Sequence, residues 1–164
     1  MVADDLPGEG AMTALHPNQI WLLRIRGLIT VVTMVLPIIV LDLALRDQHL
    51  LPAGLAPGLF ALTGLIALIL LPKRRYRGWA YREGEDELHI RHGLLMRVQT
   101  VVPFGRVQHI DVHQGPIERA YGLGTLVLHT AGNHNHSVAL PGLGHADAMA
   151  MREEIRAHVK RETM

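Results

Sequence analysis

The first half of the chain contains two long apolar stretches. Gly27 to Leu45 carries one charged residue, Asp42, in 19 positions, and Leu50 to Leu71 carries none in 22 positions. As helices rising ~1.5 Å per residue they would be about 28 and 33 Å long, which matches the ~30 Å hydrocarbon layer of a bilayer. The remaining residues are too few to bury two such helices in a soluble core. The pattern therefore predicts two transmembrane helices.

The charges that flank these stretches predict their orientation. Arg24 and Arg26 precede the first span, whereas the short connection carries Arg46 offset by Asp47. Four cations follow the second span: Lys73, Arg74, Arg75 and Arg77. Because cytoplasmic flanks are enriched in cations, we expect a multi-pass protein of the inner (cytoplasmic) membrane with both termini in the cytoplasm. The same four cations are candidate contacts for anionic lipid headgroups.

Single positions within the hairpin predict how its helices pack. Asp42 and Arg46, four residues apart, are expected to pair on one helix face. An ion pathway centred on Asp42 is the alternative, and it would require oligomers because two helices enclose no pore. Pro37 predicts a kink or a packing point in the first helix. Glycines at three positions of the second stretch favour close helix contact: Gly54, Gly58 and Gly64.

From residue 73 onward, short alternating segments separated by Gly, Pro and acidic turns indicate strands. The expected strands are Arg75–Arg82, Glu87–Arg91, Leu95–Val102, Arg106–His113, Thr125–Ala131 and His136–Leu140. Leu88 and Ile90 are expected to share one strand face, and Leu126 and Leu128 to share another. The GNHN tract at 132–135 predicts a hairpin turn, and Pro141 to Gly144 is expected to end the sheet. A helix follows from Asp147 to about Lys160, with its apolar stripe at Ala148, Met151, Ile155 and Val159.

This alternation defines the predicted fold class. We expect a membrane α-hairpin followed by an α+β, mostly β, small barrel that the C-terminal helix caps. The predicted organisation is a mobile N-terminal tail over 1–19, a transmembrane hairpin over 20–72 and a cytoplasmic domain over 73–164.

Composition narrows the class of partner. Residues 1–72 have a net charge of −2 and residues 73–164 a net charge of +3, so the basic excess is small. It lies beside the predicted membrane spans, which favours anionic lipid over nucleic acid as a partner. The chain has no cysteine, which excludes a disulfide-built fold and thiol chemistry.

The segment Arg106–His113 holds the side chains most able to bind a metal or a partner. On a strand, His109, Asp111 and His113 would share one face. One interpretation is a polar face that pairs with Glu118 and Arg119. The alternative is a metal site, although ligands ~6.5–7 Å apart on one strand are widely spaced for it. Histidines 129, 134 and 136 form a second metal candidate.

The next segment, Gln114–Gly122, predicts a turn and a short helix. Pro116 suits the first helical position and Gly122 suits the C-terminal cap. No nucleophile elbow, phosphate loop or HExxH motif occurs, so we expect no enzymatic activity and no cofactor.

The motifs PFGRVQHIDV, QGPIER, GLGTL and HTAG, spread over Val102–Gly132, and LPGL at 140–143 resemble the YdbS-like bacterial membrane proteins with a bacterial pleckstrin-homology (PH) domain. The similarity extends over about residues 15–160. It implies two N-terminal spans and one PH-like barrel, and it brings no catalytic residue set. It also implies a hetero-complex with a larger relative that contains several PH domains.

The sequence thus predicts a non-enzymatic, membrane-anchored PH-like adaptor or scaffold that binds membrane lipid and other membrane proteins. The oligomeric state stays open. The predicted interaction surface comprises Arg106, Gln108, His109, Asp111, Gln114, Glu118 and Arg119. Two alternatives remain: a metal-dependent membrane enzyme that uses His109, Asp111 and His113, or a lipid-headgroup-binding module.

Overall fold

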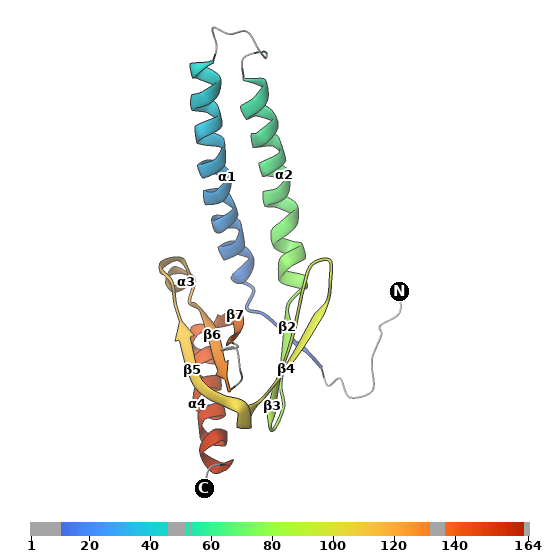
Figure 1. Ribbon diagram of the computed structural model, residues 1–164, viewed down its shortest axis with the longest axis vertical. Coiled ribbons are helices and arrows are strands. Elements are labelled where there is room, and N and C mark those ends of the chain that lie inside the picture. The colour runs from blue at the N-terminus through green and yellow to red at the C-terminus, as the bar shows by residue number, and fades with distance from the viewer. Residues whose placement is uncertain (1–10, 46–51, 53, 132–136, 163–164) are drawn as a thin grey trace. The chain divides into compact units, whose positions relative to one another are not determined.

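The computed structural model describes residues 11–45, 52, 54–131 and 137–162. The chain divides into two compact units, one of residues 20–74 and one that combines residues 1–19 with 75–164. We call them the hairpin unit and the strand-rich unit, and the ribbon in Figure 1 shows the elements of both.

The hairpin unit contains α1 (Gln19–Ala44), whose first residue lies outside the unit, and most of α2 (Leu55–Arg77). Both helices are long and apolar enough to cross a membrane. Their large apolar side chains remain exposed along the helices, among them Val32, Leu36, Leu59 and Ile69. A protein surface of this kind needs lipid to cover it. The two predicted transmembrane helices are therefore confirmed as elements.

Small residues let the two helices approach each other at one of the predicted positions. A Cβ on Gly64 would lie 2.8 Å from Cγ1 of Val31, so α1 and α2 are in close contact there. No atom of the described residues lies within 4 Å of a Cβ on Gly54 or Gly58, so the prediction was wrong for these two glycines. Asp42 accepts a 3.0 Å hydrogen bond from the backbone N–H of Gly54, whereas its predicted partner Arg46 lies outside the described residues.

The strand-rich unit contains two antiparallel sheets.

 The first sheet has the strand order β1 (Thr13–Ala14), β2 (Ala80–Glu83), β3 (Glu87–His92) and β4 (Val98–Pro103). The second has the order β5 (Val107–His113), β6 (Leu123–Thr130) and β7 (Ser137–Gly144). No helix forms part of either sheet, and over the described residues the strands do not close into one hydrogen-bonded barrel.

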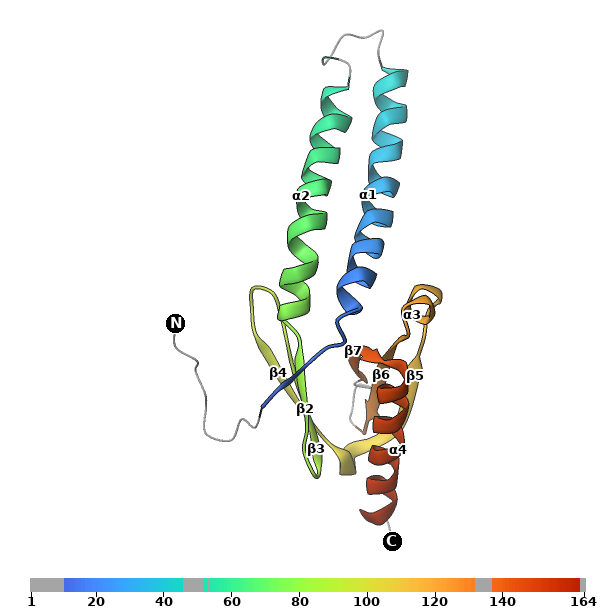
Figure 2. The same ribbon diagram turned by 180° about the vertical axis from the view of Figure 1, so that it is seen from behind.

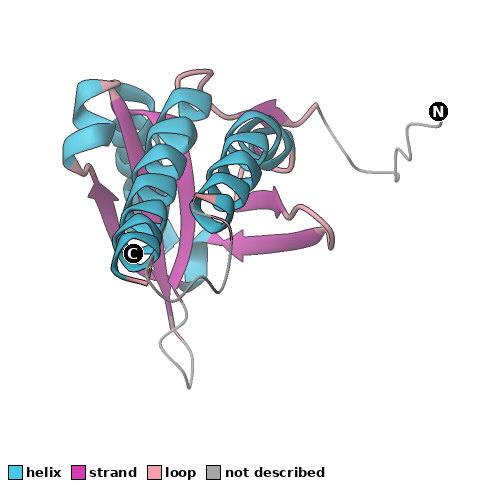
Figure 3. Ribbon diagram, turned by 90° about the horizontal axis from the view of Figure 1, so that it is seen from above, coloured by secondary structure: helices cyan, strands magenta, loops and turns pink. Residues whose placement is uncertain are grey.

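Three helical segments complete this unit. The 3₁₀ turn η2 (Phe104–Arg106) joins the sheets, α3 (Pro116–Ala120) joins β5 to β6, and α4 (His145–Glu162) ends the unit. Figures 1 and 2 both show α4 running beside β5 and β6, and Figure 3 separates helices from strands by colour. The architecture confirms the predicted α+β, mostly β, class with a C-terminal helix.

The core of the strand-rich unit lies between the two sheets and α4. Alternate residues of β3 and β6 are buried, as a period of two requires: Leu88 and Ile90, then Leu126 and Leu128. The inner face of α4 contributes Ala148, Met151 and Ile155 at helical spacing, with Val159 partly buried beside them. These faces were all predicted from the sequence.

The expected N-terminal tail is wrong for its described residues. Thr13 pairs with Tyr81 and Ala14 with Ala80, so β1 extends the first sheet. Leu15 is only 3% exposed and belongs to the core. A two-residue strand carries no periodic signal, because it forms only when a partner strand is already in place.

The predicted strand Arg75–Arg82 begins too early. Residues 75–77 still belong to α2, and β2 starts at Ala80. Arg and Tyr have helix propensities that allow α2 to continue through these positions, and the helix then ends before Gly78.

The limits of two other strands also differ from the prediction. β4 starts at Val98, because the chain turns at Gly93, which has a φ of 134°, and Leu95 and Met96 lie exposed in that turn. β7 continues through Pro141 to Gly144; it is an edge strand, where proline is tolerated. The GNHN turn lies outside the described residues.

Candidate functional site

Strand β5 carries three of the predicted surface residues, Gln108, His109 and Asp111, and it is the outer strand of its sheet. Its register with β6 shifts at the start: Val107 lies opposite Thr130, and His109 lies opposite His129. Gln108 is thus an extra residue, a β-bulge that bends the strand and re-aims the adjacent side chains. Bulges of this kind are common at sheet edges and binding sites.

Two histidines from neighbouring strands, one on β5 and one on β6, contact the same carboxylate, that of Asp111 on β5. Nε2 of His109 lies 3.0 Å from Oδ1 of Asp111, and Nε2 of His129 lies 3.3 Å from Oδ2. The two imidazole rings are 5.9 Å apart between centroids. The predicted polar face of β5 thus contributes His109 and Asp111 to a cross-strand cluster that also includes His129. His129 was missed as a partner because its position opposite His109 depends on the strand register.

The geometry gives no support to the metal alternative at His109, Asp111 and His113. Over residues 11–45, 52, 54–131 and 137–162, no three His, Asp or Glu side chains gather in an arrangement that could hold a metal ion. The second candidate set includes His134 and His136, which lie outside the described residues.

Gln114 and Glu118 have structural partners around α3. The backbone N–H of Gly115 donates a 2.7 Å hydrogen bond to Oε2 of Glu118, and the Thr125 hydroxyl donates to Oε1 at 3.3 Å. Nε2 of Gln114 donates to the carbonyl of Leu123 at 2.9 Å. Glu118 is 8% exposed, so its carboxylate caps α3 from within the fold.

The predicted boundaries of α3 are confirmed. Some of the predicted surface residues near this helix have structural partners, whereas others are exposed. Pro116 opens the helix, and Gly122, with a φ of 65°, follows its end. Arg119 on α3 and Arg106 at the end of η2 are exposed. These two arginines thus remain available to a partner, together with Gln108 and His109 on β5.

A cleft of about 380 Å³ lies between the bulged start of β5 and one side of α4. The strand contributes Val107, Gln108, His109 and Ile110, and the helix contributes Arg152, Arg156 and Val159. Positions 152, 156 and 159 share one helix face, next to the stripe that packs into the core. The cleft thus combines a strand edge with two guanidinium groups.

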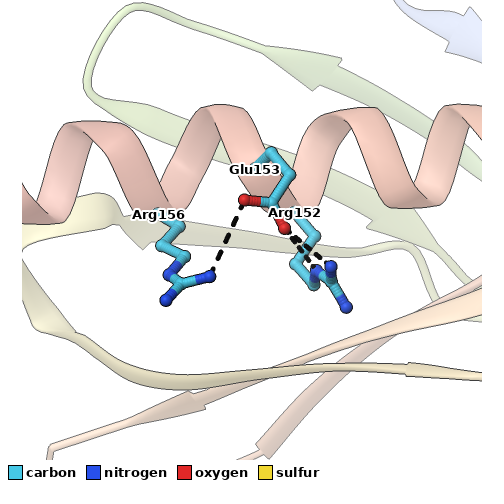
Figure 4. Close-up of polar contacts among 3 residues, drawn as sticks. All are labelled: Arg152, Glu153 and Arg156. Atoms are coloured by element: carbon cyan, nitrogen blue, oxygen red, sulfur yellow. Dashed lines mark hydrogen bonds and ion pairs between the residues drawn. The ribbon is translucent and has the colours of Figure 1, made fainter.

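Both arginines of the cleft contact one carboxylate on their own helix. Figure 4 shows Arg152 and Arg156 on either side of Glu153, with the closest N–O distances 2.6 and 3.8 Å. The Glu153 side chain is 54% exposed. Because exposed ion pairs contribute only ~0–1 kcal/mol, a carboxylate from another molecule can take the place of Glu153 at little cost.

The sequence missed the helix side of this cleft. Arg152 and Arg156 lie on the polar face of an amphipathic helix, where the pattern predicts only contact with water. Their position beside Gln108 and His109 results from the packing of α4 onto the second sheet, which no local pattern reports. The four predicted headgroup contacts, Lys73, Arg74, Arg75 and Arg77, are exposed on the last turns of α2.

Two long apolar helices followed by two antiparallel sheets and a C-terminal helix define a membrane protein with a PH-like domain. The chain belongs to the bacterial PH domain family, whose sequence model matches residues 21–159. This confirms the resemblance seen in the sequence.

The chain is also similar to a curated relative, the UPF0699 transmembrane protein YdbS of Bacillus subtilis (strain 168). The two are 32% identical over 103 residues, which is 63% of this chain and 63% of the relative. The match therefore spans less than two thirds of the relative's own length. No solved structure matches the chain.

Proposed function

We propose that this protein is a non-enzymatic, membrane-anchored adaptor that binds protein partners at the inner face of the cytoplasmic membrane. The observation that carries the proposal is the cleft between β5 and α4, which opens beside the outer edge of a sheet. In this proposal the partner inserts an extended acidic segment into the cleft.

The strand edge supplies the general affinity. An outer strand directs every second backbone N–H and C=O away from its sheet, and an extended peptide can pair with these groups as an additional strand. The bulge at Gln108 lies within the stretch of β5 that lines the cleft. It turns local side chains toward the space that the peptide would fill.

The two arginines supply the charge preference. Arg152 and Arg156 are one helical turn apart, so their guanidinium groups can contact acidic side chains spaced along one extended segment. His109 also lines the cleft, and none of the described residues that line it is acidic. This arrangement favours an acidic segment over a basic one.

The membrane anchor makes a weak interaction useful. Two segments of the chain connect the strand-rich unit to the hairpin: β1 precedes α1, and β2 follows α2. A partner in the same membrane would meet the cleft at a high effective concentration. The cations that flank both apolar stretches favour a cytoplasmic location for this unit.

A photo-crosslinking amino acid in place of Gln108, in the full-length protein in native membranes, tests the proposal. We expect a discrete crosslinked protein that is lost when Arg152→Glu and Arg156→Glu are added. Arg161→Glu is the matched control, because it reverses a charge on α4 outside the residues that line the cleft. The same crosslinked protein should persist with this control variant.

Three outcomes contradict the adaptor. They are the recovery of no specific protein, a crosslinked product that the double charge reversal leaves unchanged, and crosslinking to phospholipid alone. The last outcome would favour the lipid-headgroup module.

A further inference from the structure

The turn between β3 and β4 exposes an unusual set of apolar side chains. Leu95 is 96% exposed, Met96 78% and Leu94 48%, and Val98 and Val101 follow on β4. Within the described residues of the strand-rich unit, every exposed large apolar side chain lies between Leu94 and Val101. A cluster of exposed apolar side chains is unfavourable on a surface that contacts only water. It is typical of a surface that meets a partner or a membrane.

The turn lies beside the residues that directly follow α2. A Cβ on Gly78 would meet the carbonyl oxygen of Gly93, so the two backbones are in direct contact. The ring of Trp79 stacks on that of His92, with 4.9 Å between centroids and 25° between planes. These contacts fix the turn against Gly78 and Trp79, the two residues that directly follow α2 in the chain.

The distance from this point to the hydrocarbon layer is short. The apolar stretch ends at Leu71, and α2 continues to Arg77. Six residues of helix rise about 9 Å, which is comparable to the polar layer on one side of a bilayer. Gly78 and the turn held against it therefore lie within reach of the lipid interface.

The charges around the turn favour an anionic surface. Arg91 and Arg97 flank it, and no acidic residue occurs between Glu87 and Asp111. The opposite end of β3 is acidic, with Glu85, Asp86 and Glu87 at the turn from β2. An anionic membrane would attract the first end and repel the second, which orients the strand-rich unit.

We propose that Leu94, Leu95 and Met96 insert into the membrane interface and form a lipid contact in addition to the two transmembrane helices. Trp79 is suited to the same depth, because its ring is apolar and its N–H can reach water. The ligand is the bilayer surface. Arg91 and Arg97 give the turn a preference for anionic lipid. This inference depends on the membrane anchor and is independent of the adaptor proposal.

The lack of native cysteine makes a direct test simple. The full-length Leu95→Cys variant carries an environment-sensitive fluorophore and is reconstituted in vesicles of phosphatidylcholine and phosphatidylglycerol. Glu85→Cys, exposed at the opposite end of β3, is the control. Nitroxide-labelled acyl chains quench a probe in lipid, and iodide quenches a probe in water.

We expect the ratio of lipid quenching to iodide quenching to be several-fold higher at position 95 than at position 85. Adding Met96→Glu to the Leu95→Cys variant should lower this ratio, because the new carboxylate resists insertion. Equal ratios at the two positions would overturn the proposal. Shielding of the position 95 probe from both quenchers would also overturn it, because protein would then cover the turn.

Discussion

The hydroxyl of Tyr76 donates a 2.8 Å hydrogen bond to the backbone carbonyl of Leu15, a residue 61 positions earlier in the chain. Tyr76 lies in the last turn of α2, and Leu15 lies between β1 and α1. The bond thus joins the two segments through which the strand-rich unit connects to the hairpin. The backbone N–H of His16 adds a 2.8 Å bond to the carbonyl of Gly142 on β7.

Tyr76→Phe should weaken this connection. The variant leaves the Leu15 carbonyl without its tyrosine donor, which we expect to cost about 0.5–1.5 kcal/mol of folding stability. The shift in the unfolding midpoint in mild detergent measures it. Tyr121→Phe is the control, since the Tyr121 hydroxyl makes no hydrogen bond to the described residues and should leave the midpoint unchanged.

Glu118→Ala should destabilise the strand-rich unit. It removes the acceptor of the Gly115 N–H and of the Thr125 hydroxyl, so we expect a loss of about 1–2 kcal/mol in denaturant unfolding. Arg119→Ala changes the adjacent, exposed residue and should stay within about 0.5 kcal/mol of the unsubstituted protein. Equal losses for the two variants would contradict the capping role of Glu118.

Gly64→Val should disturb the packing of the hairpin. Its Cβ would lie 2.8 Å from Cγ1 of Val31, and the stiff Val31 side chain has little freedom to move away. Overpacking of this kind costs about 1–3 kcal/mol, measurable as a lower midpoint in a denaturing-detergent titration. Gly58→Ala, which meets nothing within 4 Å, should not lower the midpoint. If it did, the contact at Val31 would not be the cause.

Stability should depend on pH through Glu83. Burial, with a smaller contribution from the charge of Glu154, raises the pKa of Glu83 above its usual value of 4.5. The folded protein then holds this proton more tightly than the unfolded chain, so the contribution of Glu83 to stability falls as the pH rises from 4.5 through the folded pKa.

The variant Glu83→Gln isolates this effect. It should match the unsubstituted protein below that pH range and be more stable above it, as thermal unfolding across the range would show. Glu85→Gln, at an exposed position, should give the same pH profile as the unsubstituted protein. A Glu83→Gln profile that runs parallel to the unsubstituted one at every pH would refute the raised pKa.

The sequence alone determined the transmembrane hairpin, the strand-rich class and the buried faces of β3, β6 and α4. Each of these depends on the spacing of apolar residues in one short segment, and burial drives that spacing directly. The capping of α3 between Pro116 and Gly122 was also local and was predicted correctly. Segments whose conformation depends on a distant partner were not: β1 needs β2, and residues 75–77 followed the helix that precedes them.

Only the tertiary structure decided which polar residues lie together. Asp111 lies between His109 and His129 because of the register of β5 and β6. Arg152 and Arg156 line the same cleft as Gln108 because α4 buries its apolar stripe against the second sheet, which fixes where its polar face points. Apolar burial is encoded locally, whereas contacts between exposed polar residues follow from how the buried faces fit together.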